Sequence, residues 1–200
     1  MRILSAALKR SILRAFYRLA FQIAYFFSPE WAFNAFLQTI PSELLPEILT
    51  RFGAQIGKDT SILSPLRIHN MGKDKSSHFS NLNIGNHCYL GPDLFLDLSE
   101  QVIIEDRTTI SMRVSLITHM DVGQSPLRDQ QFPPRRSGIR IRHGAYLGIG
   151  VIVLMGVEIG ESAVIGAGSV INMNIPPGSV AVGGTTRIVR NLEQEKLIES

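Results

Sequence analysis

A histidine in the middle of the chain, with a carboxylate close by, has the residue types for general-base chemistry. His119 is followed two places later by Asp121. Imidazole has an unperturbed pKa of about 6.5, so near neutral pH it can take the proton of an attacking hydroxyl group. We expect Asp121, or a backbone carbonyl, to hold the other ring nitrogen and fix the tautomer. The alternative for His119 is a loop histidine without a catalytic role.

Asp97 is a second candidate for contact with a hydroxyl-bearing substrate. It directly follows the apolar Leu96, and its carboxylate could accept a hydrogen bond from a hydroxyl group of the substrate. An acid at this place can equally accept a hydrogen bond from a corner amide of the backbone. The other histidines are predicted to be non-catalytic, since a loop histidine such as His69 or His78 is usually solvated, and His87 and His143 are interpreted as structural.

The residues that must position these groups repeat with a period of six. From residue 141 onward one branched apolar residue returns at every sixth place: Ile141, Leu147, Val153, Ile159, Ile165 and Ile171. An α-helix would need a period of 3.6 and a plain strand a period of two. A period of six fits short strands joined by sharp corners, so that every sixth side chain points into one shared interior. Gly148, Gly160 and Gly166 suit corners that need a positive φ or a close backbone approach.

The same period is present upstream, with two interruptions. Its apolar positions are Ile56, Ile62, Ile68, Ile84, Leu90, Leu96 and, after a slip of two residues, Ile104, Ile110 and Leu116. Residues 70–81 form the first interruption. The second, at about 119–140, carries Arg128, Arg135 and Arg136 and is predicted to be an extruded loop that binds a ligand.

The first 53 residues are predicted to be a helical extension. Residues 1–27 contain basic residues and no acid, which favours either a basic amphipathic helix lying on an anionic membrane or a helix packed on the solenoid end or another subunit. The uncharged stretch 19–29 is too short for a bilayer span. Residues 30–52 are predicted to form two short helices that cap the solenoid, which would occupy residues 54–190, and residues 191–200 would be a C-terminal tail.

The composition limits which other classes of protein this chain can belong to. Lys and Arg exceed Asp and Glu by only three, which is too little to indicate nucleic-acid binding. A hydrophobic content of 44% is ample for a core. The single cysteine, Cys88, allows no internal disulfide and is interpreted as a buried structural thiol.

These patterns resemble the hexapeptide-repeat acyltransferases, in particular the maltose, galactoside and xenobiotic acetyltransferase branch. The resemblance is carried by the six hexads, by residues 94–121 and by residues 175–190. It implies an all-β fold, a left-handed parallel β-helix (a hexapeptide-repeat solenoid) with an N-terminal helical extension. It also implies a homotrimer.

The resemblance implies an acetyl-CoA-dependent O-acetyltransferase that acts on a sugar or surface-glycan hydroxyl in polysaccharide biosynthesis, by direct attack on the thioester with His119 as the base. We expect a cytoplasmic protein, or one peripheral at the inner face of the membrane. The alternatives are an N-acetyltransferase on an amino sugar or xenobiotic, a γ-carbonic-anhydrase-like zinc enzyme and a non-catalytic scaffold. No metal is expected, because Gln124 stands five residues after His119 and the other histidines are scattered.

The resemblance also implies that acetyl-CoA lies in a groove between two neighbouring β-helices. Arg187 and Arg190 would pair with its phosphates, Tyr146 would supply an aromatic wall, and the corner near Gly148 would hold the oxyanion donor. The residues predicted to bind the coenzyme are Tyr146, Gly148, Ile149, Ala167, Gly168, Asn172, Arg187 and Arg190. The chain departs from the family at 172–174, where Asn-Met-Asn replaces Thr-Lys-Asp, and at Thr185 and Thr186.

Overall fold

The structure is a computed structural model that describes residues 6–72, 77–130, 132–184 and 186–191. Helices come first along the chain: α1 (Ala6–Phe27), α2 (Pro29–Thr39), the 3-10 helix η1 (Ser42–Leu44) and α3 (Leu45–Arg51). Ser28 separates α1 from α2, and its hydroxyl accepts a hydrogen bond from the Trp31 N–H at 3.4 Å, which caps α2. None of the described helices combines the length and the apolar character needed to cross a membrane. The predicted tail at 191–200 lies, from residue 192 onward, outside the described residues.

Short strands then form three sheets. Sheet 1 contains β1 (Gln55–Ile56), β4 (Leu82–Ile84), β7 (Val102–Ile104), β12 (Ile139–Ile141) and β15 (Glu158–Ile159). Sheet 2 contains β2 (Ser61–Ile62), β5 (Tyr89–Leu90), β8 (Thr109–Ile110), β13 (Tyr146–Leu147), β16 (Val164–Ile165), β18 (Ser179–Val182) and β19 (Arg187–Asn191). Sheet 3 contains β3 (Leu66–His69), β6 (Leu94–Asp97), β9 (Ser115–Leu116), β14 (Ile152–Val153) and β17 (Val170–Ile171).

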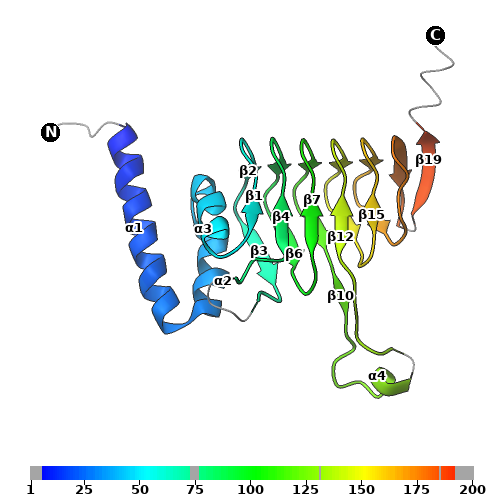
Figure 1. Cartoon of the computed structure of the whole chain (residues 1–200), viewed down its shortest axis with the longest axis horizontal. Helices are drawn as coiled ribbons and strands as arrows, with labels where there is room; N and C mark the ends of the chain where they lie inside the picture. The colour runs from blue at the N-terminus through cyan, green and yellow to red at the C-terminus, as the bar shows by residue number, and fades with distance from the viewer. Residues whose placement is uncertain (1–5, 73–76, 131, 185, 192–200) are drawn as a thin grey trace, which may run out of the picture.

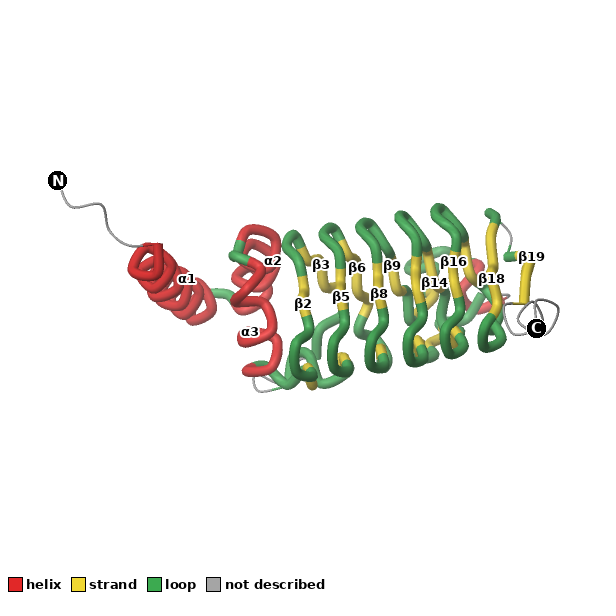
Figure 2. The backbone as a smooth tube through the Cα atoms, turned by 90° about the horizontal axis from the view of Figure 1, so that it is seen from above, coloured by secondary structure: helices red, strands yellow, loops and turns green. Residues whose placement is uncertain are grey.

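The chain visits the three sheets in turn and then begins the next coil. Figure 2 shows the successive coils side by side from above, with strands of sheets 2 and 3 labelled. Strands of successive coils pair in parallel within each sheet, and among the described strands of these sheets only the final one, β19, runs antiparallel to its neighbour β18. This arrangement confirms the predicted β-helix preceded by helices.

The hexad residues form three vertical ladders inside the coil. Ile141 pairs with Ile104 and Ile159 in sheet 1. Leu147 pairs with Ile110 and Ile165 in sheet 2, and Val153 pairs with Leu116 and Ile171 in sheet 3. All these side chains are buried. The period of six therefore arises because each hexad returns one large aliphatic side chain to a ladder, with a second buried residue two places before it, as Ala145 precedes Leu147.

Glycines at the corners serve two different needs. A Cβ added to Gly148 would lie 2.7 Å from the backbone nitrogen of Ala167, so this position needs glycine for the close approach of the next coil. Gly150 and Gly168, by contrast, have φ of +69°, a conformation that glycine adopts at little steric cost.

The helices cover the first coil, as seen at one end of Figure 1. Phe33 packs between Phe52 and Phe79, with ring centroids 5.0 and 4.8 Å away. His78, expected to be solvated in its loop, is instead buried in this cluster. Its Nδ1 lies 2.5 Å from the Gly72 carbonyl and its Nε2 lies 3.1 Å from the Tyr25 hydroxyl. The first interruption folds back onto the helices, and contact with their aromatic rings buries His78.

The second interruption leaves the solenoid as a two-stranded ribbon. β10 (His119–Met120) pairs antiparallel with β11 (Arg135–Arg136), and α4 (Leu127–Gln130) lies in the segment that joins them. Figure 1 shows the ribbon projecting downward from the coils. His119 is therefore the residue at which the chain leaves the solenoid.

Adjacent isoleucines in β7 test the interior ladders. Ile104 is buried, whereas Ile103 points outward and is partly exposed. Replacing Ile104 with alanine is expected to lower the free energy of unfolding by about 2–5 kcal/mol, since it leaves a cavity. Replacing Ile103 with alanine is expected to cost about 1 kcal/mol or less. Urea unfolding at one protein concentration measures both, and equal losses would contradict the inward assignment.

Candidate active site

His119 is placed by the end of sheet 3 and by the ribbon. It comes three residues after the inward Leu116, and the intervening Thr118 is buried. The Thr118 carbonyl accepts a hydrogen bond from the Ser137 N–H at 3.0 Å, which closes the base of the ribbon. The imidazole therefore projects from a fixed backbone at the corner between sheets 3 and 1.

The His119 ring contacts the carboxylate of Asp97. Its Nδ1 lies 2.5 Å from Asp97 Oδ2. Asp97 is the last residue of β6, one coil earlier, and its side chain is 1% exposed, whereas the His119 side chain is 29% exposed. A buried acid thus supports a histidine that remains open to a ligand.

Asp97 is surrounded by hydrogen-bond donors. Oδ1 accepts from Asn70 Nδ2 at 2.8 Å and from the Ser99 N–H at 3.2 Å, and Oδ2 accepts from the Thr118 N–H at 2.8 Å. Burial alone would raise the pKa of Asp97, but the contacts with His119, Asn70 and the backbone amides outweigh it and hold the pKa well below its usual value. The carboxylate is therefore ionised at neutral pH.

The ionised carboxylate fixes the tautomer of the neutral His119 ring. It can only accept hydrogen bonds, so the close Nδ1 must carry a proton and donate it. Asn70 Nδ2 also lies 3.3 Å from this nitrogen, but two donors cannot form a hydrogen bond with each other, and Asn70 donates to Asp97 instead. Nε2 then keeps its lone pair and is the basic nitrogen.

Two of the predicted carboxylate roles are corrected by this geometry. Asp97, and not Asp121, holds the His119 ring: Asp121 Oδ1 accepts from the Gly123 N–H at 2.8 Å and lies 3.5 Å from Arg128 Nη1. Asp121 lies on the ribbon, where it stabilises the turn. Asp97 is also too buried, and its oxygens too fully hydrogen-bonded, to contact an acceptor hydroxyl as expected.

Several residues near His119 were not predicted to belong to a site. Asn70 and Thr118 hold Asp97, while the ring of His69 lies 6.0 Å from the His119 ring and 6.3 Å from the ring of Phe95. One signal was present in the sequence. Aligning the coils on Ile68 and Leu96 places His69 directly beside Asp97 in the parallel register.

Four of the residues predicted to bind the coenzyme come together at one corner. Gly148 and Ile149 precede β14, and Ala167 and Gly168 precede β17, so all four lie at the corner between sheets 2 and 3. The Gly168 N–H donates to the Ile149 carbonyl at 2.8 Å, which joins the two coils. Ile149, Ala167 and Gly168 are exposed. Nearby in sheet 2, the exposed Tyr146 receives a hydrogen bond from the Ser111 hydroxyl at 3.2 Å.

The remaining predicted residues lie elsewhere. Asn172 follows β17 and lies at the corner between sheets 3 and 1, where its Oδ1 accepts from the Thr186 hydroxyl at 3.3 Å. Arg187 is exposed in β19, and the side chain of Arg190 lies outside the described part of the chain. His119 follows the C-terminal end of β9, and the Gly148 corner precedes the N-terminal end of β14. Because the strands of sheet 3 are parallel, these two places lie at opposite ends of the strands.

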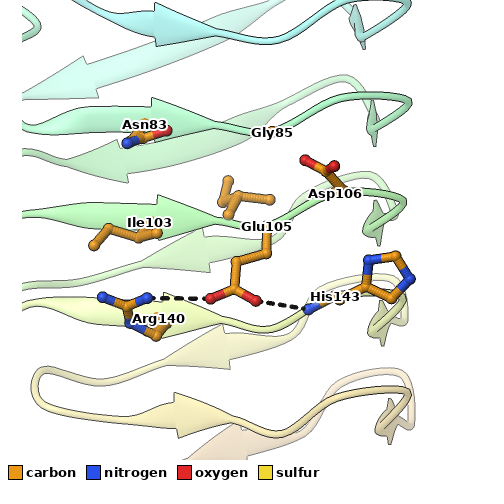
Figure 3. Close-up of a pocket in the computed structure, with 8 residues that line it drawn as sticks. Asn83, Gly85, Ile103, Glu105, Asp106, Arg140 and His143 are labelled. Carbon is orange, nitrogen blue, oxygen red and sulfur yellow. Dashed lines mark hydrogen bonds and ion pairs between the residues drawn. The ribbon is translucent and has the colours of Figure 1, made fainter.

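A separate pocket lies on sheet 1, as shown in Figure 3. It has a volume of about 400 Å³ and is lined by Asn83, Gly85, Ile103, Ile104, Glu105, Asp106, Arg140 and His143. Glu105 Oε1 lies 3.1 Å from both Arg140 Nη1 and Arg142 Nη1, and Oε2 accepts from the His143 N–H at 3.2 Å. These charges pair with one another, and the pocket contains neither His119 nor Asp97. Within the described residues, no three His, Cys, Asp or Glu side chains are grouped to hold a metal ion.

Solved structures with the same architecture include several acetyltransferases. A galactoside acetyltransferase in complex with coenzyme A is 25% identical, with a TM-score of 0.67 over 92% of this chain and 84% of that one. A maltose O-acetyltransferase from Clostridium difficile 630 is 24% identical, with a TM-score of 0.62 over 92% and 86%. A hexapeptide-repeat acetyltransferase from Vibrio cholerae is 19% identical, with a TM-score of 0.67 over 94% of both chains. No protein-family model and no curated protein sequence matches the chain, but these structures confirm the resemblance to hexapeptide-repeat acetyltransferases.

The buried Asp97 carboxylate gives a test through pH. Asp97→Asn is expected to lower the free energy of unfolding at pH 7 by about 1–3 kcal/mol, because an amide replaces an ionised acceptor. The folded-state pKa of Asp97 lies below its unfolded value of about 3.9, so the stabilisation that the ionised carboxylate contributes is complete at pH values above this unfolded pKa. It is lost as the pH falls through the folded pKa.

The difference in the free energy of unfolding between the wild type and Asp97→Asn should therefore become smaller in acid. Urea unfolding between neutral pH and pH 2 measures this difference. Asp121→Asn is the matched control. Its carboxylate is on the ribbon and partly exposed, so the change is expected to stay within about 0.5 kcal/mol. A difference for Asp97→Asn that does not vary with pH would contradict the ionised state.

Proposed function

We propose that this protein transfers the acetyl group of acetyl-CoA to a hydroxyl group of a sugar or surface glycan. The observation that carries the proposal is the His119–Asp97 pair, in which Nδ1 of a partly exposed ring contacts a carboxylate, so that Nε2 is the basic nitrogen of the neutral tautomer. The solved galactoside acetyltransferase with coenzyme A supports the donor, and the galactoside and maltose enzymes support a sugar acceptor.

His119 acts first as a base and then as an acid. Nε2 removes the proton of the acceptor hydroxyl as its oxygen attacks the thioester carbonyl carbon. The imidazolium that forms is stabilised by the ionised Asp97 at Nδ1. Collapse of the tetrahedral intermediate breaks the carbon–sulfur bond, and Nε2 returns the proton to the departing thiolate. No covalent bond to the protein is needed, because both substrates are held together for direct attack.

The corner between sheets 2 and 3 fits the narrow arm of a coenzyme. A Cβ added at Gly150 or Gly168 would meet no described heavy atom within 4 Å, so these backbone segments are open on their outer side. Small residues let a ligand approach the backbone closely. When bound there, acetyl-CoA would supply the thioester, and Arg187 would lie at the coil end suited to its phosphates.

The two halves of this site are at opposite ends of the strands of sheet 3, so we propose that they belong to different copies of the chain. His119 of one copy would face the Gly148 and Gly168 corner of the next. Such a head-to-tail contact closes into a ring, and the homotrimer of left-handed β-helices implied by the resemblance satisfies this geometry. The exposed His69 ring, stacked near Phe95, then offers a flat surface beside His119 for the acceptor.

His119→Ala is expected to lower kcat roughly 10²- to 10⁴-fold, because it removes the base. Thiol release from acetyl-CoA with a panel of sugars, amino sugars and glycans measures turnover, and calorimetry measures coenzyme binding, which should persist. His143→Ala is the matched control. The ring of His143 lies at a corner in another part of the solenoid, so this substitution is expected to leave the rate unchanged.

Full activity of His119→Ala would exclude the proposed mechanism. Turnover that is restricted to amino sugars would show that the group acetylated is an amine and not a hydroxyl. Absence of thiol release, together with absence of coenzyme binding, would leave a non-catalytic scaffold.

Mixed oligomers test whether the site is shared. Ala167→Trp should block the open corner, whereas Glu161→Trp, at the exposed corner between sheets 1 and 2, should not. Ala167→Trp and His119→Ala should each be nearly inactive alone. Oligomers refolded from an equal mixture should regain up to about a quarter of the wild-type rate, because about one interface in four joins an intact His119 to an intact corner. A mixture that stays inactive would show that both halves act within one chain.

A further inference from the structure

Helix α1 has two apolar faces. One face packs on the helical end of the solenoid through the buried Phe21, whose ring lies 5.4 Å from that of Phe33 and 5.7 Å from that of Phe52. The other face carries large apolar side chains three or four residues apart, all of them exposed: Ile12, Phe16, Leu19, Ile23, Phe26 and Phe27. Phe16 is 64% exposed, Phe26 83% and Phe27 80%. We call these six residues the outer face of α1.

The sequence of α1 is also positively charged. The sequence of Ala6–Phe27 contains Lys9, Arg10, Arg14 and Arg18 and neither aspartate nor glutamate. All four basic residues lie in the first thirteen positions of the helix, and the later part carries no charged residue. Arg18 pairs with Glu47 of α3 at 2.6 Å, which fixes α1 against the body, while Arg14 is exposed.

We propose that α1 binds the surface of an anionic lipid bilayer through its outer face. A helix that exposes a continuous apolar face and carries an excess of basic residues can lie in the interface plane, where aromatic and aliphatic side chains enter the acyl region and cations approach anionic headgroups. The absence of acids from the helix sequence favours lipid phosphates over a second copy of this chain, because the copy would bring the same positive charges together.

The position of α1 is suited to this contact. Figure 1 shows α2 and α3 between α1 and the coils. Phe21 packs toward this body, and the outer-face residues lie about half a turn of the helix away from it, so the outer face points away from the solenoid. At about 1.5 Å per residue, its 22 residues extend for roughly 33 Å along the bilayer. The exposed Trp31, just inside α2, is a side chain type that is enriched at lipid headgroups. The bilayer would thus meet the helical end, and the ribbon with His119 would stay in water.

Flotation with vesicles tests the proposal on the full-length protein. The wild type should bind vesicles of phosphatidylglycerol and phosphatidylcholine at least tenfold more tightly than vesicles of phosphatidylcholine alone. This preference should fall at 1 M NaCl, where charges are screened within about 3 Å. Phe16→Ser with Ile23→Ser should reduce binding to the anionic vesicles at least tenfold, and Arg14→Gln about fivefold. Phe132→Ser is the matched control, because this exposed phenylalanine lies on the ribbon.

Circular dichroism and the thermal midpoint must remain those of the wild type in each variant, so that a loss of binding reports the outer face and not unfolding. The proposal is overturned if the wild type does not float, or if Phe132→Ser weakens binding as much as the double variant. It is also overturned if the double variant lowers the oligomeric mass, because the face would then be a contact between copies. Thiol release without vesicles is measured separately, so a failure of the proposed enzyme activity is distinguishable.

Discussion

The structure depends on the stacking of one inward aliphatic side chain per hexad. Three ladders of Ile, Leu and Val run along the solenoid, and each rung lies above the corresponding residue of the previous coil. Apolar burial drives this stacking, and parallel pairing satisfies the backbone groups. Because the register is fixed on all three sides, residues at the corners also stand above one another. Polar groups that are distant in sequence therefore meet at the corners.

The proposed active site follows from that register. Asn70, Asp97 and His119 belong to three successive coils, yet hydrogen bonds join them. A carboxylate buried to this degree would ordinarily be driven to take up a proton, and here hydrogen bonds from side chains and backbone amides keep it charged. The outcome is an imidazole whose orientation and tautomer are both set before a substrate arrives. Such preorganisation is what proton transfer in an acyl transfer requires.

The edges and ends of the solenoid have separate roles. Sheet 3 holds His119 at one end of its strands and the open glycine corner at the other, and we propose that neighbouring copies bring these two groups together. The helical end closes the first coil with aromatic rings, which protects strand groups that would otherwise be unpaired. The outer face of α1 is left over from this closure. Its exposed phenylalanines contribute nothing to the core, and we assign them to lipid.

The sequence by itself determined the β-helix, because a period of six can be satisfied only by a chain that returns to one interior every sixth residue. It also pointed to His119, since this residue stands where the period stops. Only the tertiary structure decided that Asp97 supports His119 and that Asp121 stabilises the ribbon, because partners from different coils depend on stacking and not on nearness in sequence. Burial of His78 was likewise decided by packing: its loop looks polar by composition, but in space the rings of Tyr25, Phe33, Phe52 and Phe79 surround it.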